Sequence, residues 1–136
     1  MSNVRVLMFS FVALAVILLA IGCAPAGPEV VDVHGVVTLD GQPLDRANVV
    51  FQPANGRPSV GVTDKDGHYS LQYTNDRKGA LPGSHHVQIT SEVLFIEGQA
   101  DSGRAELLPA KYHAQSELTA DVSPENSEIN FALNSK

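Results

Sequence analysis

The chain has no tryptophan, one cysteine among its 136 residues and an aromatic content of 6%. A single cysteine excludes a disulfide bond within the chain. Nine lysines and arginines are scattered without a cluster and are outnumbered by fifteen acidic residues, a balance that argues against nucleic-acid binding. No acidic residue precedes Glu29, and no lysine or arginine lies between Arg5 and Arg46. The first part of the chain therefore differs in kind from the rest.

The N-terminus has the layout of a secretory signal. Residues 6–21 contain one polar side chain, Ser10, and Arg5 before them carries the single positive charge. A basic start, an apolar middle and small residues after it are typical of a signal peptide. The run is shorter than the roughly 20 residues of a transmembrane helix and lacks a basic flank after it. We predict a signal peptide over residues 1–22, with a signal-anchor helix as the alternative.

Cys23 stands directly after the apolar run. The stretch "LAIGC" (19–23) resembles a bacterial lipoprotein box, in which the cysteine is acylated and becomes the first residue of the mature protein. Gly22 and Cys23 match that pattern, whereas Ala20 stands where leucine is commoner. The resemblance implies a lipid on Cys23 and attachment to a membrane of the bacterial cell envelope, on its periplasmic or outer side. Cleavage after the "APA" of residues 24–26 is the other interpretation.

Residues 23–136 are enough for one domain with a single core. Removal of residues 1–22 takes away Arg5 and no acidic residue, so the formal net charge changes from −6 to −7. The segment 23–29 contains "APAGPE", whose proline, glycine and alanine favour a short tether. We therefore expect a tether over residues 23–29 and a folded domain over residues 30–136.

Strand patterns recur along the domain. Apolar side chains alternate with polar ones, as in Tyr69, Leu71 and Tyr73, which is typical of antiparallel strands with one buried face. Asp-Gly pairs in "LDGQPL" and "DKDGHY" and the "SPENS" segment (123–127) predict turns between strands. These patterns predict an all-β, seven-stranded antiparallel β-sandwich. The seven expected strands are residues 30–39, 47–52, 58–63, 68–73, 85–90, 117–122 and 128–133. Residues 93–116 are the longest connection and read as a surface loop, with a candidate helical turn at 105–108.

Two stretches resemble a known family. "GVVTLDGQPLDRANVVFQP" (35–53) and "GVTDKDGHYSL" (61–71) are similar to the carboxypeptidase regulatory-like, or transthyretin-like, β-sandwich. "LPGSHHVQI" (81–89) and "LPAKY" (108–112) resemble segments of small lipoproteins that carry this domain alone. The resemblance covers roughly residues 30–134 and implies an accessory module, with His85 standing where an aromatic residue is commoner.

Catalytic and metal-binding patterns are not found. A calcium loop that began at Asp64 would need a carboxylate twelve positions along, where Asn75 stands, so "DKDG" is interpreted as a hairpin turn. No serine has a G-x-S-x-G setting, and the chain ends without the Tyr-Arg-Gly-Ser motif of 5-hydroxyisourate hydrolases. The five histidines form no zinc-binding pattern: His34, His68, His85, His86 and His113. We therefore expect no metal, no cofactor and no catalytic residue.

These observations predict a secreted, lipid-anchored, non-catalytic module of the cell envelope with a structural or protein-interaction role. Its partners would be the membrane, through Cys23, and an envelope protein or a glycan. The alternative is a carbohydrate- or peptidoglycan-binding module, and a more distant alternative is a transthyretin-like hydrolase. Tyr112 and Phe95, in the long loop, are the candidate exposed aromatics. Outward polar side chains that could meet a glycan are Asn48, Gln52, His68, Ser70, Gln72, His86, Gln88 and Thr90.

Overall fold

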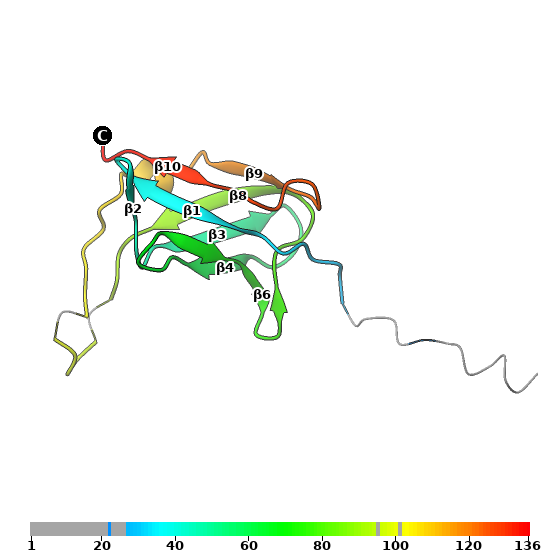
Figure 1. Cartoon of the computed structure of the whole chain (residues 1–136), viewed down its shortest axis with the longest axis horizontal. Helices are drawn as coiled ribbons and strands as arrows, with labels where there is room; N and C mark the ends of the chain where they lie inside the picture. Colours follow the sequence, from blue (N-terminus) through cyan, green and yellow to red (C-terminus); the bar gives the residue numbers. More distant parts are fainter. Residues whose placement is uncertain (1–21, 23–26, 95, 101) are drawn as a thin grey trace, which may run out of the picture.

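The computed structural model describes residues 22, 27–94, 96–100 and 102–136, which fold into two packed β-sheets (Figure 1). Within these residues the one helical element is a short 3₁₀ turn, η1 (Ala110–Tyr112). No helix in this part of the chain is long and apolar enough to cross a membrane. The all-β prediction is confirmed.

The larger sheet has six strands, and all its neighbours are antiparallel. Its centre is the long pairing of β3 with β8, which matches Val49 with Ile89 and Phe51 with Val87. These four side chains are fully buried and alternate with more exposed ones, as the sequence predicts. In sheet order the strands are β7 (Arg77–Lys78), β6 (Gln72–Thr74), β4 (Ser59–Val62), β3 (Asn48–Pro53), β8 (Gly83–Thr90) and β9 (Thr119–Val122).

The smaller sheet is built around β1 (His34–Leu39). The strands β2 (Gln42–Pro43) and β5 (His68–Ser70) pair with β1 antiparallel, and β10 (Phe131–Leu133) pairs with it in parallel. The expected fully antiparallel arrangement is therefore wrong at this edge. The chain leaves β9 in the larger sheet and crosses to the smaller one, so β10 runs in the same direction as β1. Side chains alternate with a period of two in parallel and antiparallel strands alike, so the alternation in the sequence does not indicate the direction of β10.

One predicted strand serves both sheets. Residues 68–73 were expected as a single element, but β5 pairs with β1 while β6 pairs with β4 in the other sheet. Leu71 lies at the change of sheet, where its N–H donates to the carbonyl of Val33 at 2.9 Å and its side chain is fully buried. This switch, together with the short β2 and β7, raises the number of described strands from the predicted seven to ten.

The two Asp-Gly turns have different geometries. Asp40 and Gly41 both have positive φ, 51° and 81°, which is the two-residue type I′ hairpin between β1 and β2. At residues 64–67 the N–H of Gly67 donates to the carbonyl of Asp64 at 2.9 Å, and the N–H of Asp64 donates to His68. Gly67 has a φ of 78°, so this hairpin has three loop residues instead of the expected two.

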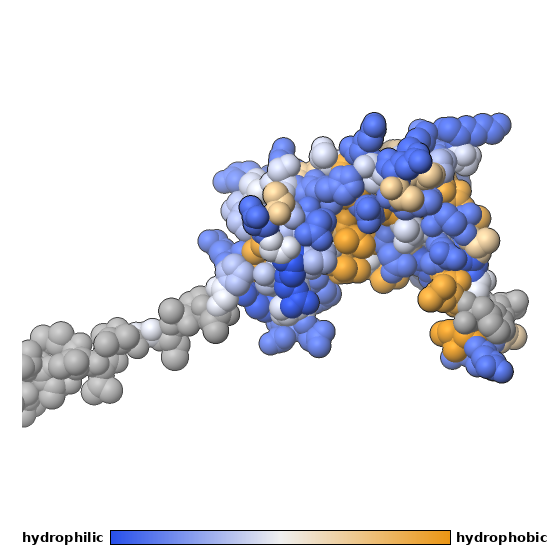
Figure 2. All heavy atoms as spheres, turned by 180° about the vertical axis from the view of Figure 1, so that it is seen from behind, coloured by the Kyte–Doolittle hydropathy of each residue, from blue (hydrophilic) through white to orange (hydrophobic). Residues whose placement is uncertain are grey.

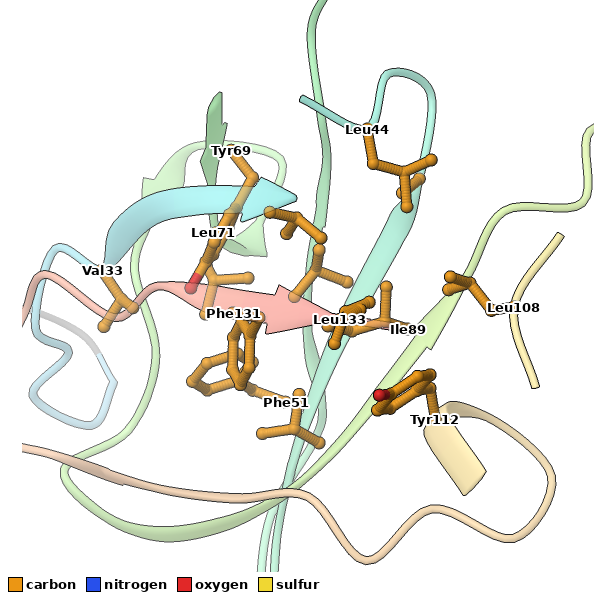
Figure 3. Packing of buried hydrophobic residues seen from close by; sticks show 14 of the residues in the cluster. Val33, Leu44, Phe51, Tyr69, Leu71, Ile89, Leu108, Tyr112, Phe131 and Leu133 are labelled. Carbon is orange, nitrogen blue, oxygen red and sulfur yellow. The ribbon is translucent and has the colours of Figure 1, made fainter. Parts of the chain in front are cut away.

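The core lies between the sheets and is aromatic at its centre (Figure 3). The ring of Phe51 meets Phe131 edge-on at 6.1 Å between centroids and lies 6.5 Å from Tyr69. The Tyr69 hydroxyl donates to the carbonyl of Ile129 at 2.6 Å, and burial raises its pKa above the usual range. Contributions to this core from both sheets hold the domain together, because each sheet alone would expose its apolar face.

Candidate functional site

Cys23 lies outside the described residues, so the predicted lipid site has no structural description. The chain beyond it is bound to the domain from Pro28 onward. The Arg77 guanidinium donates to the carbonyl of Pro28, and the backbones of Val31 and Ala80 exchange hydrogen bonds of 2.8 and 2.9 Å. The tether therefore leaves the domain beside the β6–β7 hairpin (Figure 1).

Next to the tether is an open groove with a volume of about 610 Å³, here called the tether groove. Its charged members are Arg57 and Lys78, both exposed, and no acidic side chain lines it. Its floor includes the buried ring of Tyr73, with the Arg57 guanidinium carbon 5.6 Å from the ring centroid. The lining residues are Arg57, Pro58, Val60, Gln72, Tyr73, Thr74, Asn75 and Lys78.

The groove cations are available for an anionic ligand. Within the described residues the ion pairs join Arg46 and Arg104 to Asp45, so neither Arg57 nor Lys78 has a carboxylate partner there. Arg77 also lies near the Tyr73 ring, with its guanidinium carbon 5.9 Å from the centroid, but it is already engaged with the tether. Guanidinium groups over an aromatic face gain cation–π attraction, which holds both arginines near the ring.

A second candidate surface is the loop of residues 92–107, here called the apolar loop. It leaves the domain after β8, and an isolated bridge between Val93 and Arg104 closes its base. Arg104 donates to the Ser91 carbonyl at 2.8 Å and pairs with Asp45 at 3.1 Å, so the loop is tied to the β2–β3 connection as well. The candidate helical turn at 105–108 is wrong; the 3₁₀ turn comes later, at η1.

Glu106 closes the base from the other side. Its carboxylate accepts from the hydroxyl and N–H of Ser91, at 2.5 and 3.0 Å, and from the N–H of Leu108 at 2.9 Å. Partial burial disfavours the charged form, but these hydrogen bonds outweigh it and hold the pKa of Glu106 below its usual range. Ser91 is fully buried, so the carboxylate satisfies polar groups that water cannot reach.

Beyond this base the loop carries exposed aliphatic side chains. Leu94 is 76% exposed and Ile96 is 54% exposed; at the base itself Leu107, whose N–H donates to the Ser91 hydroxyl at 2.8 Å, has a side chain that is 49% exposed. Figure 2 shows apolar atoms gathered on the loop where it hangs from the body of the domain. Residues 92–103 contain three acidic residues and no lysine or arginine. The apolar loop therefore combines a hydrogen-bonded base with exposed aliphatic side chains and an acidic composition.

The predicted polar face of the larger sheet is interrupted by aliphatic residues. Val60 and Val62 on β4 are 39% and 57% exposed, and Val60 pairs with the half-buried Val50 on β3. Gln52, Gln72, His86 and Gln88 are exposed on this sheet, and Asn48 and Thr90 are half-buried; His68 and Ser70 are exposed on β5 of the other sheet. The polar residues therefore form no single platform.

The histidines are dispersed. Within the described residues no group of three or more His, Cys, Asp or Glu side chains could hold a metal ion. His85 is 2% exposed, its Nε2–H donates to the Leu81 carbonyl at 2.7 Å, and its ring centroid lies 5.6 Å from that of Phe51. Its neighbour Ser84 is exposed on the opposite face, so the two do not form a nucleophile–base pair. His85 occupies a core position.

Of the two candidate exposed aromatics, only Tyr112 lies within the described residues. Tyr112, expected to be exposed, is 9% exposed and belongs to the core; its hydroxyl accepts from the N–H of Asn134 at 3.1 Å. It is buried because η1 places its ring against the hydrophobic cluster. Phe95 lies outside the described residues.

The sequence matches no known family model, and no curated protein or solved structure is significantly similar to it. Sequence reasoning missed both surfaces described above. Arg57 and Lys78 are 21 positions apart and line the same groove because β4 pairs with β6 and β6 pairs with β7. Glu106 and Ser91 are separated by the whole loop. One sequence feature indicated the apolar loop, namely the apolar "VLFI" of residues 93–96, which is followed by mostly polar and small residues.

Proposed function

We propose that the protein is a non-catalytic, lipid-anchored module of the bacterial cell envelope that binds another envelope protein through the apolar loop. A carboxypeptidase regulatory-like, transthyretin-like sandwich is the proposed fold family, on the residues quoted above. The observation that carries the proposal is the combination of a hydrogen-bonded loop base with exposed Leu94, Ile96 and Leu107. Ordered loops with exposed apolar tips are typical of interaction sites.

The charge of the loop favours a protein partner over the lipid surface. Glu92 and Glu97 flank the exposed Leu94 and Ile96, and no basic side chain occurs in residues 92–103. An anionic bilayer would repel such a tip, because like charges near the surface raise its energy. A protein with an apolar recess and a basic rim would match both properties.

Anchoring is tested at Cys23. We expect intact mass measurement of the native protein to show a chain that begins at Cys23 and carries acyl chains, and detergent partitioning to place it in the detergent phase. Cys23→Ser should remove the lipid mass. A mature chain that begins at Gly27 without added mass would contradict the lipoprotein proposal.

Partner binding is tested with a photocrosslinking amino acid at Ile96 in the full-length protein, expressed in its native envelope. We expect a crosslinked partner that is lost on Leu94→Ser, and a binary complex that forms again from purified components. A crosslinker at Ser84, exposed on β8, is the matched control. Crosslinking to a second copy of the chain, or no crosslinking at Ile96, would overturn the proposal.

Catalysis is tested directly. The purified protein should not hydrolyse peptides, glycosides or 5-hydroxyisourate, since among the described residues no serine or threonine hydroxyl is hydrogen-bonded to a histidine and Ser91, which is bound to Glu106, is fully buried. Turnover that disappears on His113→Gln or His85→Phe would instead support the hydrolase alternative.

A further inference from the structure

The tether and the apolar loop leave the domain at opposite ends (Figure 1), and the groove lies on the tether side, because Tyr73 of the groove neighbours Arg77, which holds the tether. The groove end is held close to any membrane that anchors the N-terminus. Pro28, fixed by Arg77, follows Cys23 by five positions, and five extended residues span at most about 18 Å. The groove therefore stays near the surface whether or not it contacts it.

The chemistry of the groove fits phosphate-bearing headgroups. Arg57 and Lys78 are exposed cations without carboxylate partners among the described residues, and the neutral members Gln72 and Asn75 can add hydrogen bonds, whereas the Thr74 hydroxyl donates to Asp76 at 3.4 Å. The acidic residues that lie between Arg57 and Lys78 in the sequence, Asp64, Asp66 and Asp76, do not line it. Arginine recognises phosphate through several N–H groups and lysine as a point charge.

We propose that the tether groove docks on anionic phospholipid headgroups of the membrane that anchors the chain, with Arg57 and Lys78 facing the phosphates. The proposal rests on the envelope location proposed above but does not require a lipid on Cys23. Docking fixes the orientation of an otherwise acidic domain and turns the apolar loop away from the bilayer, toward a protein partner. Basic groups close to an anionic surface are attracted over about one Debye length, roughly 8–10 Å.

The test uses the full-length chain with Cys23→Ser, which removes the only cysteine and leaves the apolar run 6–21 to insert into vesicles. One reporter cysteine is introduced by Asn75→Cys in the groove, or by Asn134→Cys near the C-terminus at the far end (Figure 1). Each carries a fluorophore that is quenched by spin-labelled headgroups. The vesicles are phosphatidylcholine alone or phosphatidylcholine mixed with phosphatidylglycerol.

We expect phosphatidylglycerol to increase quenching at residue 75 and not at residue 134. Because each basic side chain near an anionic surface contributes roughly a fivefold preference, Arg57→Gln with Lys78→Gln should lower the ratio of docked to undocked protein at least about tenfold. High salt should have the same effect on the unaltered groove. The matched control, Lys65→Gln with Lys111→Gln, removes equal charge elsewhere and should keep the increase.

Quenching that does not depend on phosphatidylglycerol, that survives the groove variant, or that falls equally in the control would overturn the proposal. Binding of a soluble acidic polysaccharide without lipid-dependent quenching would also overturn it, in favour of a glycan site. Thermal melts of each variant verify folding. Since the chain tested has no Cys23, failure here is separate from failure of the lipoprotein proposal.

Discussion

The two ends of the domain differ in how their charged side chains are used. At the tether end, Arg57 and Arg77 lie over the buried ring of Tyr73, and the chain is bound by backbone hydrogen bonds at Val31 and by Arg77. At the loop end, the charged groups Arg104 and Glu106 are turned inward to hold the base, and the exposed groups are aliphatic. Charge is thus available for a ligand at one end and used for structure at the other.

The largest effect is expected at the tether end, at Gly79. Its φ is 110°, and an added Cβ would lie 2.0 Å from the Val31 carbonyl oxygen. Gly83 has a similar φ of 118° but open space around it, so it isolates the backbone strain. Gly83→Ala should cost about 1–3 kcal/mol of unfolding free energy. Gly79→Ala should cost roughly 2 kcal/mol more, because the clash separates Val31 from Ala80. Chemical denaturation measures both; equal costs would show that the tether is not packed there.

At the loop end, Glu106→Gln should lower the unfolding free energy by about 2–3 kcal/mol, since it replaces a charged acceptor of several hydrogen bonds and leaves buried Ser91 poorly paired. Glu97→Gln, on an exposed side chain of the same loop, is the control and should change stability little. Urea denaturation at neutral pH compares the two, and a similar small loss in both would mean that the loop base is not held by this carboxylate.

The same carboxylate predicts a pH dependence. Hydrogen bonds lower the pKa of Glu106 in the folded state, so its contribution is fully present above the unfolded pKa, near 4.3, and is lost as pH falls through the folded value. The parent protein should therefore lose stability below about pH 5, and the difference between parent and Glu106→Gln should shrink there. A difference that is constant from pH 7 to about pH 3 would contradict the assignment.

An exposed carboxylate provides a smaller reference for the loop base. Asp64 accepts from the N–H groups of Asp66 and His68 at 2.9 and 3.0 Å, but it lies in a solvent-exposed turn. Asp64→Ala should cost about 1 kcal/mol, less than Glu106→Gln, because water can replace the lost acceptor. Melts with calcium and with chelator should coincide for both proteins. A calcium-dependent rise in melting temperature would show that the turn binds an ion.

The smallest effects on stability are expected for the exposed groups that we assign to binding. Leu94→Ser with Ile96→Ser, and Arg57→Gln with Lys78→Gln, should each change the unfolding free energy by less than about 0.5 kcal/mol. Those side chains project into solvent and stabilise little. A loss above 1 kcal/mol in either double variant would mean that the surface is part of the fold, and would break the contrast between the ends.

Much of the fold could be predicted from local pattern. Alternation placed Tyr69, Leu71 and Tyr73 on a buried face, and Asp40–Gly41 predicted a turn, which the structure forms as a two-residue hairpin. The parallel pairing of β10 with β1 could not be predicted, since side-chain alternation does not depend on strand direction. The burial of His85 and Tyr112 also depended on neighbours far away in the chain, Phe51 for the former and the C-terminal segment at Asn134 for the latter.

Local sequence settled the all-β class and which side of each strand faces inward, because alternation and turn residues act within a few positions. Tertiary structure alone decided which strand changes sheets at Leu71, placed Arg57 and Lys78 along one groove and brought Ser91 to Glu106. These contacts join residues more than ten positions apart, so they form only when sheet order brings their strands and loops together. Both candidate surfaces are consequences of that order, which no short stretch of the chain encodes.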